Sequence, residues 1–286
     1  MTKKATKDLS ESDPENRSEN RPENRLELYK LIPNMITLMA LMSGLTAIQF
    51  AIKGRIEVAV TLILVAAILD MLDGATARLL NAKSELGAQL DSLSDFLCFG
   101  VAPAFILYMW GLDEAGKLGW IATTAYAAAC ALRLARFNIT KPITEKKSAW
   151  NDGFFQGVPA PAGAGLSMLP LFIWFQSPET FSTLSFANPL IGVWTIFVAA
   201  LMISRIPTWS SKQIHFHKKM ALPIMAGGAL VFASLLHAPW TTLMALSFAY
   251  LISIPCAFRK FRKTEQSYDE ASEDLTDLAL GIGKED

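Results

Sequence analysis

The chain has 286 residues, of which 52% are hydrophobic, and its formal net charge at pH 7 is zero. Its mean hydropathy of +0.31 is higher than that of an ordinary water-soluble domain. A net charge of zero provides no overall basic field, which argues against nucleic acid as a partner. We therefore expect a membrane protein that binds no nucleic acid.

The chain begins with a polar segment. Residues 1–27 are rich in charged and amide side chains and repeat the triplet Glu-Asn-Arg three times. Such a composition cannot bury enough apolar surface to fold, so we expect a disordered tail. The overlapping segment 26–33 combines apolar residues with Tyr29 and Lys30, which predicts a short helix at the membrane interface.

Long apolar segments fill most of the remaining chain. Each is long enough to cross roughly 30 Å of hydrocarbon as a helix, which predicts an all-α polytopic bundle of about eight transmembrane helices. We take residues 28–258 as the membrane-embedded domain and 259–286 as a tail, first basic and then acidic, with disorder expected from residue 264. The expected spans are 34–52, 56–80, 87–110, 118–139, 158–176, 188–206, 221–237 and 239–258.

Lysine and arginine are distributed unevenly between alternate connections. With a cytoplasmic N-terminus, the outer connections carry only Lys53, Arg55 and Lys117. Positive residues favour the cytoplasmic side of a membrane. The bias predicts that both termini, and the turn between the second and third spans, lie in the cytoplasm. The inner connections carry Arg25, Lys30, Lys83, Lys141, Lys146, Lys147, Lys212, Lys218, Lys219, Arg259, Lys260, Arg262 and Lys263.

That turn separates two pairs of carboxylates. The acids are Asp70, Asp73, Asp91 and Asp95. Ionisable groups near a bilayer are costly unless paired or metal-bound, so they are functional candidates. Members of each pair are three or four residues apart and so share one face of a helix. A short polar turn at 81–85 makes the two helices antiparallel neighbours, which can bring all four acids together.

Four negative charges beside one guanidinium, that of Arg78, need a further counter-charge. One or two divalent cations would supply it. Arg78 offers two parallel donors to a phosphate group. The small residues Gly74, Ala77 and Gly87 allow close approach of a second helix or a flat ligand. These features together predict a metal–diphosphate site rather than an ion-pair network that fixes helix packing.

The run D-x2-D-G-x2-A-R-x8-G-x3-D-x3-D is complete from Asp70 to Asp95 and resembles the signature of the CDP-alcohol phosphatidyltransferases. These integral membrane enzymes displace CMP from a CDP-linked donor with an alcohol. The resemblance implies a divalent cation, Mg²⁺ or Mn²⁺, and a homodimer in the cell (inner) membrane. It implies metal ligation by Asp70, Asp73 and Asp91, joined by Asp95, with catalysis by Asp95 as general base together with Asp91. It also implies a cytidine pocket lined by Gly74, Ala77 and Gly87, with Arg78 on the diphosphate.

Five further stretches resemble members of that family whose acceptor is L-serine. The resemblance implies transfer from CDP-diacylglycerol to L-serine, giving phosphatidylserine and CMP. Glycerol 3-phosphate, inositol phosphate and choline remain alternative acceptors. A membrane prenyltransferase, or a transporter with an Asp ion site, remains a more distant alternative, since neither requires the D-G-x2-A-R run. The stretches are 33–37, 91–104, 132–138, 155–162 and 204–208.

Two further groups are candidates for substrate contacts. Arg133 and Arg136 lie three residues apart at the cytoplasmic end of the fourth span, with Asn138 beyond them. A serine carboxylate needs a cation nearby, although these arginines could also simply mark the positive end of a helix. Asn34 and Thr37 begin the first span, where they could bind donor phosphate or nucleotide, or Asn34 could cap the helix.

Overall fold

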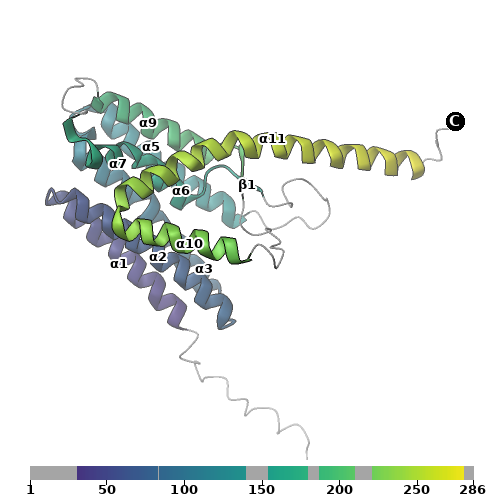
Figure 1. Ribbon diagram of the computed structural model, residues 1–286, viewed down its shortest axis with the longest axis horizontal. Coiled ribbons are helices and arrows are strands. Elements are labelled where there is room, and N and C mark those ends of the chain that lie inside the picture. The colour runs from purple at the N-terminus through teal and green to yellow at the C-terminus, as the bar shows by residue number, and fades with distance from the viewer. Residues whose placement is uncertain (1–30, 83, 140–153, 180–186, 210–220, 280–286) are drawn as a thin grey trace, which may run out of the picture.

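The computed structural model is an almost wholly helical bundle with one long C-terminal helix (Figure 1). It describes residues 31–82, 84–139, 154–179, 187–209 and 221–279. The predicted tail 1–27 and most of the predicted interfacial helix lie outside these residues. In chain order the elements are α1 (Ile32–Ile52), α2 (Ile56–Leu79), α3 (Glu85–Asp95), η3 (Phe96–Val101), α4 (Ala102–Leu107), η4 (Tyr108–Leu112), α5 (Lys117–Ile139), β1 (Phe154–Gln156), α6 (Ala160–Ser167), α7 (Leu169–Gln176), α9 (Ala187–Ile203), β2 (Pro207–Trp209), α10 (Ala221–His237) and α11 (Pro239–Ala279).

Small residues form the contact between α1 and α2. The buried positions include Ala47 on α1 and both Ala59 and Ala66 on α2. Small side chains let two helix backbones approach closely within a membrane. Gly54, with φ of +72°, permits the sharp reversal between the two helices. The C-terminal end of α2 therefore lies beside the N-terminal end of α1.

The third predicted span is one continuous helix from Glu85 to Leu112, and two π-helical stretches, η3 and η4, interrupt its regular winding. The first of them begins directly after Asp95. Such irregular turns are frequent at functional sites. Within η3, the Cys98 thiol donates to the Ala40 carbonyl at 3.2 Å, which ties this helix to α1.

The fourth predicted span is α5, which packs against η3 and α9. Its fully buried Tyr126 donates a hydrogen bond to the Phe99 carbonyl at 2.8 Å. Near the start of α5, Gly119 lies directly against the backbone of Leu112. These contacts fix α5 beside the helix that carries Asp95.

The fifth predicted span, residues 158–176, is divided into α6 and α7. Met168 ends α6 and precedes α7, and Pro170 is placed in the first turn of α7, where an N–H has no helical partner. The antiparallel strands β1 and β2 pair Phe154 with Trp209. Our all-α expectation missed this small pair, because each three-residue strand depends on a partner that is distant in the sequence.

The last helix, α11, continues beyond the predicted span 239–258 to Ala279 (Figure 1). Our expectation of disorder from residue 264 is therefore wrong as far as Ala279. The helix also crosses the predicted domain boundary without a break. Phe261 packs edge-on against Phe154 of β1, with ring centroids 5.4 Å apart. This contact provides a reason for the extension, because it holds the helix against the strand pair.

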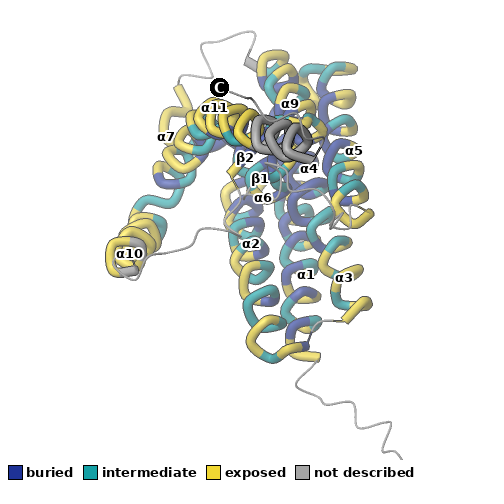
Figure 2. Tube along the Cα trace, turned by 90° about the vertical axis from the view of Figure 1, so that its right-hand side faces the viewer, coloured by how far each residue is buried: buried dark blue, intermediate teal, exposed yellow. Residues whose placement is uncertain are grey.

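α4 is buried along nearly all of its length and packs against both α1 and α5, whereas α10 is exposed along nearly all of its length (Figure 2). α10 packs on α11 and stands apart from α1, α2 and α3. Because most side chains of α10 are apolar, this helix is suited to contact lipid.

Within the described residues, five helices are long and apolar enough to cross a membrane. They are α1, α2, the helix Glu85–Leu112, α5 and the part Pro239–Ser267 of α11. α9 and α10 contain shorter apolar stretches, Asn188–Ile203 and Met225–His237. The chain is an integral membrane protein, and the number of about eight spans stays a prediction.

A first prediction concerns helix packing at Gly119. A methyl group at this position would overlap the Leu112 carbonyl oxygen, so the backbone must move in Gly119→Ala. We expect a loss of at least about 1–3 kcal/mol in stability, measured as thermal unfolding in detergent. Gly228→Ala is the matched control, because a methyl group there meets no atom of the described residues within 4 Å. Equal unfolding temperatures for the two variants would contradict this packing.

Candidate active site

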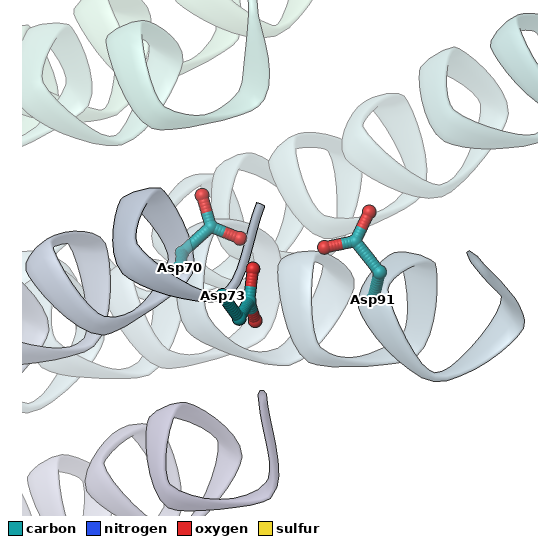
Figure 3. Close-up of side chains that lie close together, drawn as sticks. All are labelled: Asp70, Asp73 and Asp91. Carbon is teal, nitrogen blue, oxygen red and sulfur yellow. The ribbon is translucent and has the colours of Figure 1, made fainter. Parts of the chain in front are cut away.

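Three of the predicted carboxylates converge between α2 and α3. Asp70 and Asp73 project from the last turns of α2, and Asp91 faces them from α3 (Figure 3). One ligand oxygen from each lies within 4.8 Å of the other two. We call Asp70, Asp73 and Asp91 the acidic cluster.

The turn between α2 and α3 creates this convergence. Asn81 adopts a left-handed conformation with φ of 49°, which asparagine tolerates better than most residues. Ser84 caps α3, and its hydroxyl accepts a hydrogen bond from the Gly87 amide at 3.0 Å. The polar turn predicted from the sequence therefore reverses the chain and sets the register of the two acidic helices.

Asp95 lies one turn beyond Asp91 and outside the acidic cluster. Its carboxyl group is within hydrogen-bonding reach of Asp70, and Arg133 of α5 interacts with it electrostatically. Two carboxyl groups this close repel each other when both are ionised, so they require a shared proton or a cation. The structure thus brings Asp95 to the acids, but against Asp70 rather than among the three converging oxygens.

The acidic cluster has the chemistry of a site for a hard divalent cation. All three candidate ligands are carboxylates, which Mg²⁺ and Mn²⁺ prefer. Asp73 is only 3% exposed, and its Oδ2 is buried without a hydrogen-bond partner in the described part of the chain. A buried, unsatisfied carboxylate oxygen is costly, and a cation would satisfy it. The residues therefore fit a divalent ion.

A pocket of about 210 Å³ opens beside these acids, between α1, α2 and α3. The sequence assigned six residues to nucleotide or phosphate contacts. Five of them line this pocket, and the sixth, Arg78, does not. The lining residues are Pro33, Asn34, Thr37, Asp73, Gly74, Ala77, Ala82, Ser84, Gly87, Ala88 and Asp91. We call this cavity the α1–α3 pocket.

Glycine allows the close approach of helices around the α1–α3 pocket. A methyl group on Gly87 would lie 2.8 Å from Asn34 Oδ1, which is closer than real contacts permit. Gly74 also lines the pocket, and a methyl group there would be in ordinary contact with the Arg78 guanidinium, 3.9 Å from one of its nitrogens. Arg78 is exposed and lies at the rim, where its guanidinium can reach an anion in the pocket.

The three residues proposed for the acceptor separate into different roles. Arg136 donates to the Ile203 carbonyl at 3.2 Å and to the Ser204 carbonyl at 3.3 Å, so it holds the end of α9. Asn138 donates to Ser92 Oγ at 3.0 Å, next to Asp91. Arg133 instead faces Asp95.

Sequence reasoning missed Tyr250 of α11. Its hydroxyl is buried without a hydrogen-bond partner among the described residues, and it interacts electrostatically with Arg133. The available signal was a polar hydroxyl within an apolar span, which needs a partner when buried. Nothing in the spacing of the chain connects this residue to α5.

Two known protein families match parts of this chain. Residues 30–204 match the family described as CDP-alcohol phosphatidyltransferase. The chain belongs to the CDP-alcohol phosphatidyltransferase family. Residues 219–255, which include all of α10 and the first part of α11, match the family described as CDP-alcohol phosphatidyltransferase 2. The family resemblance inferred from the run between Asp70 and Asp95 is thereby confirmed.

Several curated relatives in this family carry one name, CDP-diacylglycerol–serine O-phosphatidyltransferase. The protein of Mycobacterium tuberculosis is 36% identical over 234 residues, which is 82% of this chain and 80% of the relative. That of Helicobacter pylori is 31% identical over 212 residues, covering 73% and 84%. That of Bacillus subtilis is 32% identical over 197 residues, covering 68% and 97%.

A second prediction tests the acidic cluster. We expect Asp73→Asn to weaken Mn²⁺ binding by at least about tenfold, because it removes a charged ligand from a three-carboxylate site. Electron paramagnetic resonance of free Mn²⁺ measures the affinity in purified protein. Asp113→Asn is the control, because this exposed acid follows η4, at the opposite end of the helix Glu85–Leu112 from Asp91. Mn²⁺ affinity equal to wild type in Asp73→Asn would reject the cluster as a metal site.

Proposed function

We propose that this protein transfers a phosphatidyl group from CDP-diacylglycerol to L-serine, giving phosphatidylserine and CMP. The observation that carries the proposal is the acidic cluster at the wall of the α1–α3 pocket, in a chain of this family. The name shared by its relatives supports serine as the acceptor.

The donor is proposed to bind with its acyl chains in the bilayer and its nucleotide in the α1–α3 pocket. Gly74, Ala77 and Gly87 leave room for the cytidine, and Asn34 and Thr37 offer polar groups at the start of α1. Arg78 binds the diphosphate from the rim. Neutralisation of the diphosphate and of the departing CMP is the chemistry that a divalent cation, Mg²⁺ or Mn²⁺, supplies in the acidic cluster.

Asp95 is proposed as the general base. It accepts the proton of the serine hydroxyl, whose oxygen attacks the lipid-side phosphorus. The bond between that phosphorus and the bridging oxygen breaks, and CMP leaves. Asp70 lies within hydrogen-bonding reach of the Asp95 carboxyl, and Asp91, which assists catalysis as a member of the acidic cluster, lies one turn earlier on the same helix as Asp95. A carboxylate outside the cluster is suited to this task, because its oxygen is not used for metal ligation.

The acceptor is proposed to approach from the side of α5. Arg133 provides the cation that a serine carboxylate requires, and its Nε is buried without a hydrogen-bond partner among the described residues. Choline carries no carboxylate, and neither does glycerol 3-phosphate.

We propose that the enzyme lies in the cell (inner) membrane with both termini and the active site on the cytoplasmic side. The lysine and arginine bias of the sequence supports this orientation. Trp240 at the start of α11 donates to Glu57 at the start of α2, so these two helices begin at the same end of the bundle. The homodimer and contacts with membrane lipids are proposed from family resemblance.

A third prediction concerns the acceptor. Purified protein supplied with CDP-diacylglycerol and Mn²⁺ should release CMP when L-serine is added. Glycerol 3-phosphate, inositol phosphate and choline should give little release, because they cannot present a carboxylate to Arg133. Chromatography of radiolabelled lipid should identify phosphatidylserine as the product.

Two outcomes of this screen would contradict the proposal. Faster CMP release with another alcohol would show that the protein transfers phosphatidyl groups but that L-serine is not its preferred acceptor. Absence of CMP release with all four alcohols, in protein that binds CDP-diacylglycerol, would reject phosphatidyl transfer.

A fourth prediction concerns Asp95. We expect Asp95→Asn to lower kcat by about 10²–10⁴-fold, because the amide cannot accept the serine proton. Mn²⁺ affinity should change far less than in Asp73→Asn, since Asp95 lies outside the three converging oxygens. Near-normal turnover in a folded Asp95→Asn protein would remove Asp95 from the role of base, and a loss explained entirely by Mn²⁺ affinity would make it a ligand.

A further inference from the structure

Four buried side-chain polar atoms have no hydrogen-bond partner among the described residues. They are Asp73 Oδ2, Asp95 Oδ1, Arg133 Nε and the Tyr250 hydroxyl. Buried polar atoms are nearly always satisfied, so each of these requires an explanation. Asp73 belongs to the acidic cluster. The other three come from α3, α5 and α11, and we call them the acceptor cluster.

The members of the acceptor cluster are neighbours in space although they are far apart in the chain. Arg133 interacts electrostatically with both Asp95 and Tyr250. Arg133 therefore links a carboxylate of the motif with a hydroxyl from the last helix. The Thr208 hydroxyl of β2 lies near the same hydroxyl, but the two do not meet the geometry of a hydrogen bond, and Thr208 instead donates to the Gly157 carbonyl at 2.8 Å.

Tyr250 is held facing the bundle by the packing of α11. One turn earlier, Ser247 is buried and its hydroxyl donates to the Gly165 carbonyl of α6 at 3.4 Å. Two turns later, Ala257 is fully buried against Phe154 and Phe261. These two contacts lie on the same face of the helix as Tyr250.

The unpaired groups of the acceptor cluster are complementary to an amino-acid alcohol. Arg133 Nε is a donor, and the Tyr250 hydroxyl can donate as well. Two donors match the two oxygens of one carboxylate. The unpaired Asp95 oxygen is an acceptor, which matches the hydroxyl of the same molecule. Arg136 is engaged with the end of α9 and is not needed for this match.

We propose that Tyr250 and Arg133 together bind the carboxylate of L-serine and direct its hydroxyl to Asp95. This inference rests on the proposed function and adds Tyr250 as a specificity-determining residue. The run between Asp70 and Asp95 then binds the nucleotide-linked donor, while α11 completes the site for the acceptor. An alcohol without an anionic group, such as choline, leaves both donors unpaired, which disfavours its binding.

The test is Tyr250→Phe, which removes one hydroxyl and retains the ring. We expect the KM for L-serine to rise by about 10- to 100-fold, the usual effect of losing a hydrogen bond to a charged group. The KM for CDP-diacylglycerol and the affinity for Mn²⁺ should stay within about twofold of wild type. Tyr108→Phe is the control, because this ring packs edge-on against Trp120 and lies in η4, at the other end of the long helix from the acids.

Ethanolamine provides a second measurement, because it is L-serine without the carboxylate. The inhibition constant of ethanolamine, measured in competition with L-serine, should be the same within about twofold in wild type and in Tyr250→Phe. If Tyr250→Phe raised this constant and the KM for L-serine by the same factor, the proposal would be overturned, because the effect would not act through the carboxylate. An unchanged KM for L-serine would overturn it as well.

Failure of this inference is distinguishable from failure of the proposed function. Serine-dependent CMP release by wild type, with an unchanged KM in Tyr250→Phe, rejects the role of Tyr250 and leaves the reaction intact. Wild type that releases no CMP with L-serine rejects both. If Tyr250→Phe does not fold, the wild-type protein alone provides the test, through the KM for L-serine and the inhibition constant of ethanolamine. Similar values of the two constants overturn carboxylate recognition. A KM for L-serine far below the inhibition constant of ethanolamine supports it.

Discussion

The repulsion between carboxylates held at one end of an apolar helix bundle is the constraint on which the rest of the structure depends. Asp70, Asp73 and Asp91 converge within 4.8 Å, and Asp95 lies against Asp70. In surroundings of low polarity this arrangement is unfavourable unless positive charge enters it. The repelling carboxylates therefore favour the binding of a cation, and a bound cation attracts an anionic diphosphate. The carboxylates lower the stability of the empty fold and strengthen ligand binding, as is common at functional sites.

The helices around this charge are arranged to bring it together without closing the space beside it. Glycine at 74 and 87 keeps the walls of the α1–α3 pocket open, and the Ser84 cap fixes where α3 begins. The π-helical turn η3 starts at the residue after Asp95, so the helix changes its winding where the acidic run ends. On the far side of Asp95, α5 and α11 contribute Arg133 and Tyr250. Asp95 therefore stands between the proposed donor side and the proposed acceptor side.

Much of the donor side could be predicted from the sequence, because its residues are local. Asp70, Asp73, Gly74, Ala77 and Arg78 belong to one helix, so helical spacing places them relative to one another. The polar turn at 81–85 is short enough to require an antiparallel neighbour, which brings Asp91 opposite. The acceptor side was predicted less well. Arg133 and Arg136 were indistinguishable by spacing, and their different partners, Asp95 and the end of α9, became apparent only when the helices were packed.

The sequence by itself determined that the chain is a helical membrane protein, which family it belongs to, and which acids form its reactive end. Hydrophobic segment length and short-range spacing are properties of neighbouring residues, so a single chain read in order is sufficient for them. The tertiary structure alone decided that Asp95 lies outside the three converging oxygens, that β1 pairs with β2, and that Tyr250 approaches Arg133. These relations join residues far apart in the chain, and packing between helices fixes them where no local periodicity can.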